Sequence, residues 1–126
     1  MPAADALHPL VLLVDDSEDN REVYAQYLAL SGFRVEIAVD GVEAVEKASS
    51  LRPDVIVMDL AMPRLDGWEA TRRIKAAPAT SQTPVIALTG NADSDSKRRT
   101  LEAGCSGYLT KPCLPDVLVS EIRRLL

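Results

Sequence analysis

Acidic side chains end two of the apolar runs in this sequence. Asp15 and Asp16 follow the run at residues 10–14, and Asp59 follows the run at residues 55–58. Adjacent carboxylates repel one another, and a buried carboxylate is costly unless a positive group pairs with it. The two endings therefore require a common cause, and a bound cation would supply it.

Two more polar side chains extend this set. Thr89 ends the apolar run at residues 84–89, and Lys111 follows a short run at residues 107–109. Carboxylates hold Mg²⁺ together with waters and phosphate oxygens, a lysine ammonium binds phosphate, and a hydroxyl can bond to a phosphoryl oxygen. A carboxylate can also act as the nucleophile toward a phosphoryl group. The set predicts Mg²⁺-assisted phosphoryl transfer onto an aspartate.

Alternating strands and helices are predicted to position these residues. The predicted strands cover residues 10–14, 34–39, 55–58, 84–89 and 107–109. The predicted helices cover residues 20–31 and 94–103, and others begin after Asp40, after Asp66 and at Pro115. Continuous Val, Ile and Leu strands that alternate with amphipathic helices imply an α/β fold with a parallel sheet covered on both faces. Ligands bind beyond the carboxyl ends of such strands, where the polar set would gather.

The predicted helices differ in how firmly they are anchored. The helix at residues 20–31 is expected to bury one side, made of Val23, Tyr24, Tyr27 and Leu28. The helix at residues 94–103 has few apolar residues, mainly Leu101 and Ala103, and Gly104 ends it. Because weakly anchored elements can shift, this helix is expected to be the mobile one.

Helix capping offers a simpler explanation for some of the acidic residues. Asp40 and Asp66 are each followed three residues later by a glutamate, which is the capping-box pattern, and they are predicted to be caps. Asp16 or Ser17 could cap the first helix in the same way. For Asp16, the presence of the other members of the polar set favours the metal-binding interpretation.

The composition sets limits on the function. The chain has 126 residues, a formal net charge of −5, two cysteines and one histidine. This length favours a single domain, and the negative charge argues against direct nucleic-acid binding. No apolar run approaches the ~20 residues of a membrane span, so no membrane insertion is expected. The spacing of the cysteines supports neither a zinc site nor a disulfide, and reduced thiols indicate a cytoplasmic protein.

Four stretches together resemble the receiver domain of two-component response regulators. They are VLLVDDSEDN (residues 11–20), VIVMDLAMPRLDG (residues 55–67), PVIALTG (residues 84–90) and GYLTKP (residues 107–112). The resemblance covers residues 9–126, after a short leader at residues 1–8. It implies a doubly wound, flavodoxin-like sheet of five parallel strands in the order 2-1-3-4-5, with helices on both faces.

The resemblance also implies roles for the acidic residues. Asp59 resembles the aspartate that accepts the phosphoryl group, from a histidine kinase or a phosphotransferase domain. Asp15 and Asp16 resemble the acidic pair that holds Mg²⁺, and Ala61 would offer its backbone carbonyl to the metal. The family acts as a signalling switch rather than as an enzyme, apart from its self-catalysed phosphoryl transfer and hydrolysis.

A second group of positions resembles the family's switch. Thr89 resembles the hydroxyl residue that moves to the phosphoryl group, and Tyr108 occupies the place of the switch aromatic. Lys111 resembles the lysine that pairs with the phosphoryl group, and the Lys111–Pro112 bond resembles one that is cis in the family. The signal would leave through the helix at residues 94–103, the fifth strand and the last helix. A downstream protein, or a second copy of the chain, would bind there.

Some positions depart from the family pattern. Gly90 follows the threonine where alanine is common, and Cys113 stands where phenylalanine often follows the proline. Ala61 and Asn91 occupy positions that tune the lifetime of the phosphoryl group. The sequence leaves open whether the chain acts alone or belongs to a larger regulator or hybrid kinase.

Three other classes of function fit the sequence less well than a receiver domain does. A phosphatase or mutase with an aspartyl-phosphate intermediate commonly has a second acid two residues after its nucleophile, and Ala61 stands there instead. A flavin carrier on the same fold needs a first loop rich in Ser, Thr and Gly, and the acidic loop at residues 15–20 would repel a phosphate. A scaffold that has lost its chemistry would lack at least one key residue, and none is missing.

Overall fold

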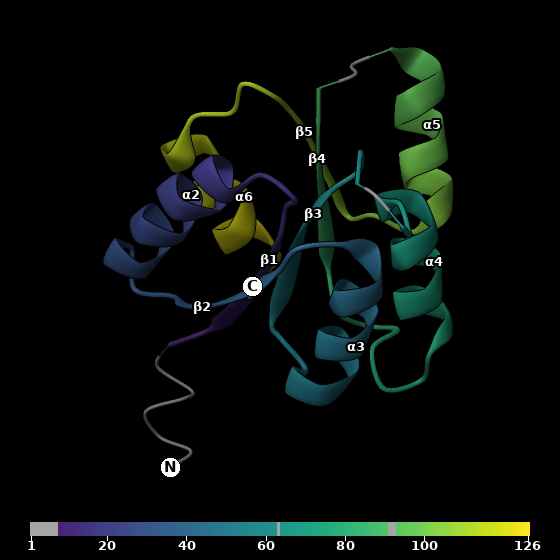
Figure 1. The fold of residues 1–126 in the computed structure, drawn as a ribbon, viewed down its shortest axis with the longest axis horizontal. Coiled ribbons are helices and arrows are strands. Elements are labelled where there is room, and N and C mark those ends of the chain that lie inside the picture. The colour runs from purple at the N-terminus through teal and green to yellow at the C-terminus, as the bar shows by residue number, and fades with distance from the viewer. Residues whose placement is uncertain (1–7, 63, 91–92) are drawn as a thin grey trace.

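The computed structural model describes residues 8–62, 64–90 and 93–126. Within these residues, strands and helices alternate along the whole chain, as predicted (Figure 1). The strands are β1 (Leu10–Val14), β2 (Arg34–Ala38), β3 (Val55–Asp59), β4 (Val85–Thr89) and β5 (Gly107–Thr110). The helices are α2 (Glu18–Leu30), α3 (Gly41–Leu51), α4 (Gly67–Ala76), α5 (Ser94–Ala103) and α6 (Pro115–Leu125).

The five strands form one parallel sheet in the order β2-β1-β3-β4-β5. This is the order that the resemblance implied. Helices α2 and α6 cover one face of the sheet, and α3, α4 and α5 cover the other (Figure 1). The fold is therefore doubly wound, and β1 and β3 lie side by side in its centre.

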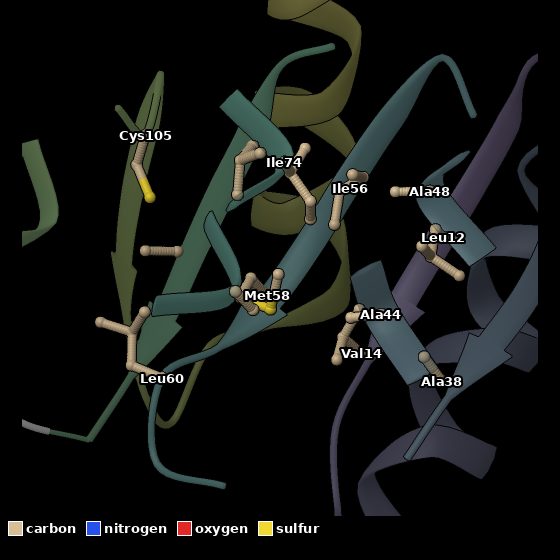
Figure 2. Packing of buried hydrophobic residues seen from close by; sticks show 13 residues of the cluster. Leu12, Val14, Ala38, Ala44, Ala48, Ile56, Met58, Leu60, Ile74 and Cys105 are labelled. Atoms are coloured by element: carbon tan, nitrogen blue, oxygen red, sulfur yellow. The ribbon is translucent and has the colours of Figure 1, made fainter. Parts of the chain in front are cut away.

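Two hydrophobic clusters fill the space between the sheet and its helices. Alternate residues of β1 point to opposite faces, so Leu12 belongs to the cluster under α3 and α4, and Leu13 belongs to the cluster under α2 and α6. Figure 2 shows the first cluster, in which Met58 and Ile74 also take part. Strands β1, β3 and β4 are buried along their whole length, which explains why they are continuous apolar runs.

The predicted caps are confirmed, but the capping boxes are not complete. Asp40 accepts the backbone N–H of Glu43, and Asp66 accepts the backbone N–H of Glu69. The Glu43 carboxylate accepts the N–H of Val39 rather than that of Asp40, and the Glu69 carboxylate pairs with two arginines of α4. The acidic caps therefore act without the reciprocal bond from the glutamate.

Two predictions about helix faces were wrong in part. In α2, Tyr24 and Leu28 are buried, but Val23 is 57% exposed and Tyr27 is 39% exposed. Helix α2 packs on β1 and β2 and lies beside α6, and these contacts leave Val23 and Tyr27 partly in solvent. The helix also begins at Glu18 rather than at residue 20.

Helix α5 is anchored only in part by the residues expected, since Ala103 is buried as predicted but Leu101 is not. Leu101 is 54% exposed, whereas Ser96, Thr100 and Ala103 are buried. The side that α5 turns inward is therefore mostly polar, and Thr100 receives a hydrogen bond from the Trp68 indole of α4 over 3.1 Å. The weak apolar anchoring expected for this helix is thus more pronounced than the sequence indicated.

No helix in the described part of the chain is long and apolar enough to cross a membrane. The prediction for Asn91 lies outside the described residues, as does most of the leader.

Candidate functional site

Three carboxylates meet at the carboxyl ends of β1 and β3. The parallel register pairs Val14 with Met58, so the residues that follow them, Asp15 and Asp59, are neighbours at this edge of the sheet. Asp16 joins them from the loop before α2, and one carboxylate oxygen from each of the three lies within 4.8 Å of the others. Asp15 and Asp59 are buried, whereas Asp16 is exposed. The site is therefore open to solvent on the side of Asp16.

Lys111 places a positive charge between the two buried carboxylates. Its Nζ lies 3.4 Å from Asp15 Oδ2 and 3.4 Å from Asp59 Oδ2. The backbone N–H of Lys111 donates to the carbonyl of Thr89 over 2.7 Å, which keeps the chain beside β4 after β5 has ended. The Lys111–Pro112 peptide bond is cis, as the resemblance implied.

Burial and charge shift the pKa values of the central groups. Burial is the largest influence on Asp59 and raises its pKa to about 6, although Lys111 and the N–H of Ala61 both favour the ionised form. Burial by itself lowers the pKa of Lys111, but the attraction of Asp59 and Asp15 outweighs it, so that pKa lies above its ordinary value. One ammonium group thus compensates the three carboxylates only in part.

The donor set fits a magnesium ion. All three side chains offer oxygen ligands, which suit a hard cation, and the exposed position of Asp16 leaves room for the waters that Mg²⁺ retains. The incomplete compensation by Lys111 leaves negative charge for a divalent cation to neutralise. Ala61 is held at the same site because its backbone N–H donates to Asp59 Oδ1 over 3.1 Å.

The two expected switch residues lie on the neighbouring strands. Thr89 is buried at the end of β4, where the register pairs Leu88 with Asp59. Tyr108 is half-buried on β5 opposite Ala87 and packs against the cluster under α3 and α4. Thr89 therefore lies on the strand next to Asp59, and Tyr108 lies one strand further along the sheet.

The structure decides which of the two candidate residues caps α2, and it shows contacts that the sequence analysis missed. Ser17, rather than Asp16, caps α2, which leaves the carboxylate of Asp16 for the acidic site. Arg21, one turn into α2, donates from its guanidinium to the carbonyl oxygen of Asp15. Gly67 begins α4 directly against Asp59, since a Cβ at Gly67 would lie 2.5 Å from the Asp59 carbonyl oxygen. For the contact of Arg21 with Asp15, the signal in the sequence was the short spacing of Arg21 from the acidic pair.

Comparison with known proteins places the chain in a family. Residues 11–123 match the response regulator receiver domain. The chain is 39% identical over 116 residues to the response regulator MprA of Mycobacterium ulcerans, and equally identical to that of Mycobacterium leprae. These matches cover 92% of the chain but 49% and 50% of the relatives, so the chain spans about half the length of the curated relatives it matches.

Solved structures give the same result. The chemotaxis protein CheY4 of Vibrio cholerae is similar with a TM-score of 0.90 and 34% identity, covering 94% of this chain and 99% of that one. The receiver domain of the sensor histidine kinase PA1611 from Pseudomonas aeruginosa has a TM-score of 0.88 and 38% identity, covering 94% and 97%. That structure is described with a magnesium ion coordinated in the active site cleft. The chain belongs to the response regulator receiver domain family, the phospho-acceptor signalling domains of two-component systems.

Proposed function

We propose that Asp59 accepts a phosphoryl group from a histidine kinase or a phosphotransferase domain in a Mg²⁺-dependent reaction. The observation that carries this proposal is the position of Lys111, 3.4 Å from both Asp59 and Asp15, beside a three-carboxylate cluster. Asp15, Asp16, Asp59 and the carbonyl of Ala61 are the proposed metal ligands. Mg²⁺, when bound, neutralises charge on the carboxylates and on the phosphoryl oxygens.

The residues of the chain have distinct tasks in this reaction. A carboxylate oxygen of Asp59 attacks phosphorus, the bond from phosphorus to the donor nitrogen breaks, and its electron pair leaves with the donor imidazole. The Lys111 ammonium pairs with one phosphoryl oxygen, and the Thr89 hydroxyl donates to another. With a pKa of about 6 before the metal binds, Asp59 is mainly ionised at neutral pH and can act as the nucleophile.

We further propose the bounds of the domain, its self-catalysed chemistry and the surface through which it signals. Residues 9–126 form the receiver domain, and the domain catalyses its own phosphoryl transfer and hydrolysis. Its output passes through Tyr108 to a surface made of α5, β5 and α6, which binds a downstream protein or a second copy of the chain rather than nucleic acid. We place this action in the cytoplasm, which the two free thiols of Cys105 and Cys113 support.

Intact-mass measurement tests the central claim. With Mg²⁺ and a small phosphodonor such as phosphoramidate, the protein should gain one phosphoryl group that is labile to base. Asp59→Asn should abolish the gain. Asp54→Asn is a matched control, because Asp54 lies just before the opposite end of β3, where it accepts the N–H of Leu10. Equal labelling of the Asp59→Asn protein would overturn the assignment.

A further inference from the structure

Arg21 contacts the backbone of the acidic pair rather than a carboxylate. Its Nη1 donates to the carbonyl oxygen of Asp15 over 2.9 Å. The backbone of Arg21 is itself held, since its N–H donates to the carbonyl of Ser17 in the first turn of α2. Arg21 is therefore held at its backbone by the helix and at its guanidinium by the loop, at the end of α2 nearest the acidic site.

The Asp15 carbonyl belongs to the peptide unit that leads into Asp16. Because a peptide unit is planar, holding its oxygen also sets the direction of the chain into Asp16. The preceding peptide unit is held separately by the bond from the Asp15 N–H to the carbonyl of Ala38 over 3.1 Å. The bond from Arg21 therefore holds the next peptide unit, which lies beyond the end of β2.

Asp15 and Asp16 differ in how their side chains are held. The carboxylate of Asp15 accepts the N–H of Ser17 over 2.9 Å and pairs with Lys111. Among the described residues, the carboxylate of Asp16 has neither a hydrogen bond nor an ion pair that would orient it. The position of Asp16 therefore depends on the backbone that Arg21 holds.

We propose that Arg21 is a positioning residue for the magnesium site, which it serves by holding the peptide unit between Asp15 and Asp16. This inference rests on the proposed function, because it assumes that the cluster binds Mg²⁺. A positive charge near the site also repels a divalent cation, so removal of Arg21 has two opposite effects. The positioning effect is the larger one, and loss of the side chain weakens metal binding.

Calorimetric titration of the full chain with MgCl₂ measures the balance of these effects. Arg21→Met keeps most of the apolar stem but removes the charge and the donors, and should raise the Mg²⁺ dissociation constant about 10-fold. Arg21→Lys keeps a charge and a donor, and should restore most of the affinity. Arg72→Met removes the same charge from an exposed pair with Glu69 on α4, and should leave the affinity unchanged.

Amide hydrogen exchange of the metal-free proteins provides a readout that does not depend on Mg²⁺. Arg21→Met should speed exchange at residues 15–18 and not in β3. Arg21→Lys, which is the milder change, keeps the inference testable if the methionine variant does not fold. Unchanged or tighter Mg²⁺ binding by Arg21→Met would overturn the inference and leave the proposed function intact. Failure of the unsubstituted protein to bind Mg²⁺ would overturn both.

Discussion

The hydroxyl of Tyr24 donates a hydrogen bond of 2.8 Å to the carbonyl oxygen of Cys113, 89 positions later in the chain. The bond joins α2 to the segment that directly follows Lys111 and Pro112. Burial raises the pKa of Tyr24, so its hydroxyl remains protonated and able to donate. One residue of α2 thus helps to hold the loop that carries the lysine of the acidic site.

Removing this hydroxyl should lower stability. Tyr24→Phe leaves the Cys113 carbonyl without its donor, and should lower the free energy of unfolding by about 1 kcal/mol. Chemical denaturation measures the change. Tyr27→Phe is the control. Tyr27 lies on the same helix and is 39% exposed, so removal of its hydroxyl should change the free energy of unfolding little. Equal losses in the two variants would show that the bond to Cys113 adds no stability.

The raised pKa of Asp59 should make metal-free stability depend on pH. The carboxyl binds its proton more tightly in the folded protein, where its pKa is about 6, than in the unfolded chain, where it is near 3.8. Its contribution is therefore fully favourable below pH 4 and is lost as the pH rises through 6. Relative to the unsubstituted protein, Asp59→Asn should gain stability over this range, by about 3 kcal/mol in total at about 1.4 kcal/mol per pKa unit.

Urea denaturation without Mg²⁺ at pH 4, 5, 6 and 7 would measure this difference. Asp19→Asn, in the exposed first turn of α2, is a control that should show no such rise. A difference between Asp59→Asn and the unsubstituted protein that stays constant from pH 4 to pH 7 would contradict the raised pKa.

Gly67 should be intolerant of a side chain. A Cβ there would lie 2.5 Å from the Asp59 carbonyl oxygen and 2.7 Å from Leu60 Cα, which are backbone atoms that cannot turn aside. Gly67→Ala should cost about 1–3 kcal/mol of stability and slow the labelling of Asp59. Gly90→Ala is the matched control, since no described atom lies within 4 Å of its Cβ position. Similar thermal unfolding of both variants would show that α4 adjusts without strain.

Phosphorylation should loosen or shift α5. It adds about −1.5 to −2 of charge beside Thr89, whose hydroxyl is expected to move toward it, while Tyr108 turns inward. Because α5 turns a mostly polar side inward and receives the Trp68 indole N–H on Thr100, fluorescence of this single tryptophan should also change.

Amide hydrogen exchange with and without beryllofluoride locates the response. Changes should concentrate in α5, β5 and the loop after Asp59, and should be absent from the Asp59→Asn protein. Changes confined to α3 would contradict this route for the signal.

Much of the architecture follows from the sequence alone. A strand of a parallel sheet that is covered on both faces must be apolar at every position, so β1, β3 and β4 appear as unbroken Val, Ile and Leu runs. The residue that ends such a run lies at the carboxyl edge of the sheet. For this reason the sequence alone predicts that Asp15, Asp59 and Lys111 lie at one place.

Tertiary packing determined two kinds of feature that the local sequence pattern does not encode, namely which helix sides are buried and which distant segments are joined by hydrogen bonds. The sides of α2 and α5 that face the protein depend on which neighbours cover them, so Val23 and Leu101 are exposed although both are apolar. The bonds from Tyr24 to Cys113 and from Arg21 to Asp15 depend on how α2 sits against the loops at the edge of the sheet. Periodicity along a chain reports which residues prefer burial, but hydrogen bonds between distant segments exist only after the helices have packed on the sheet.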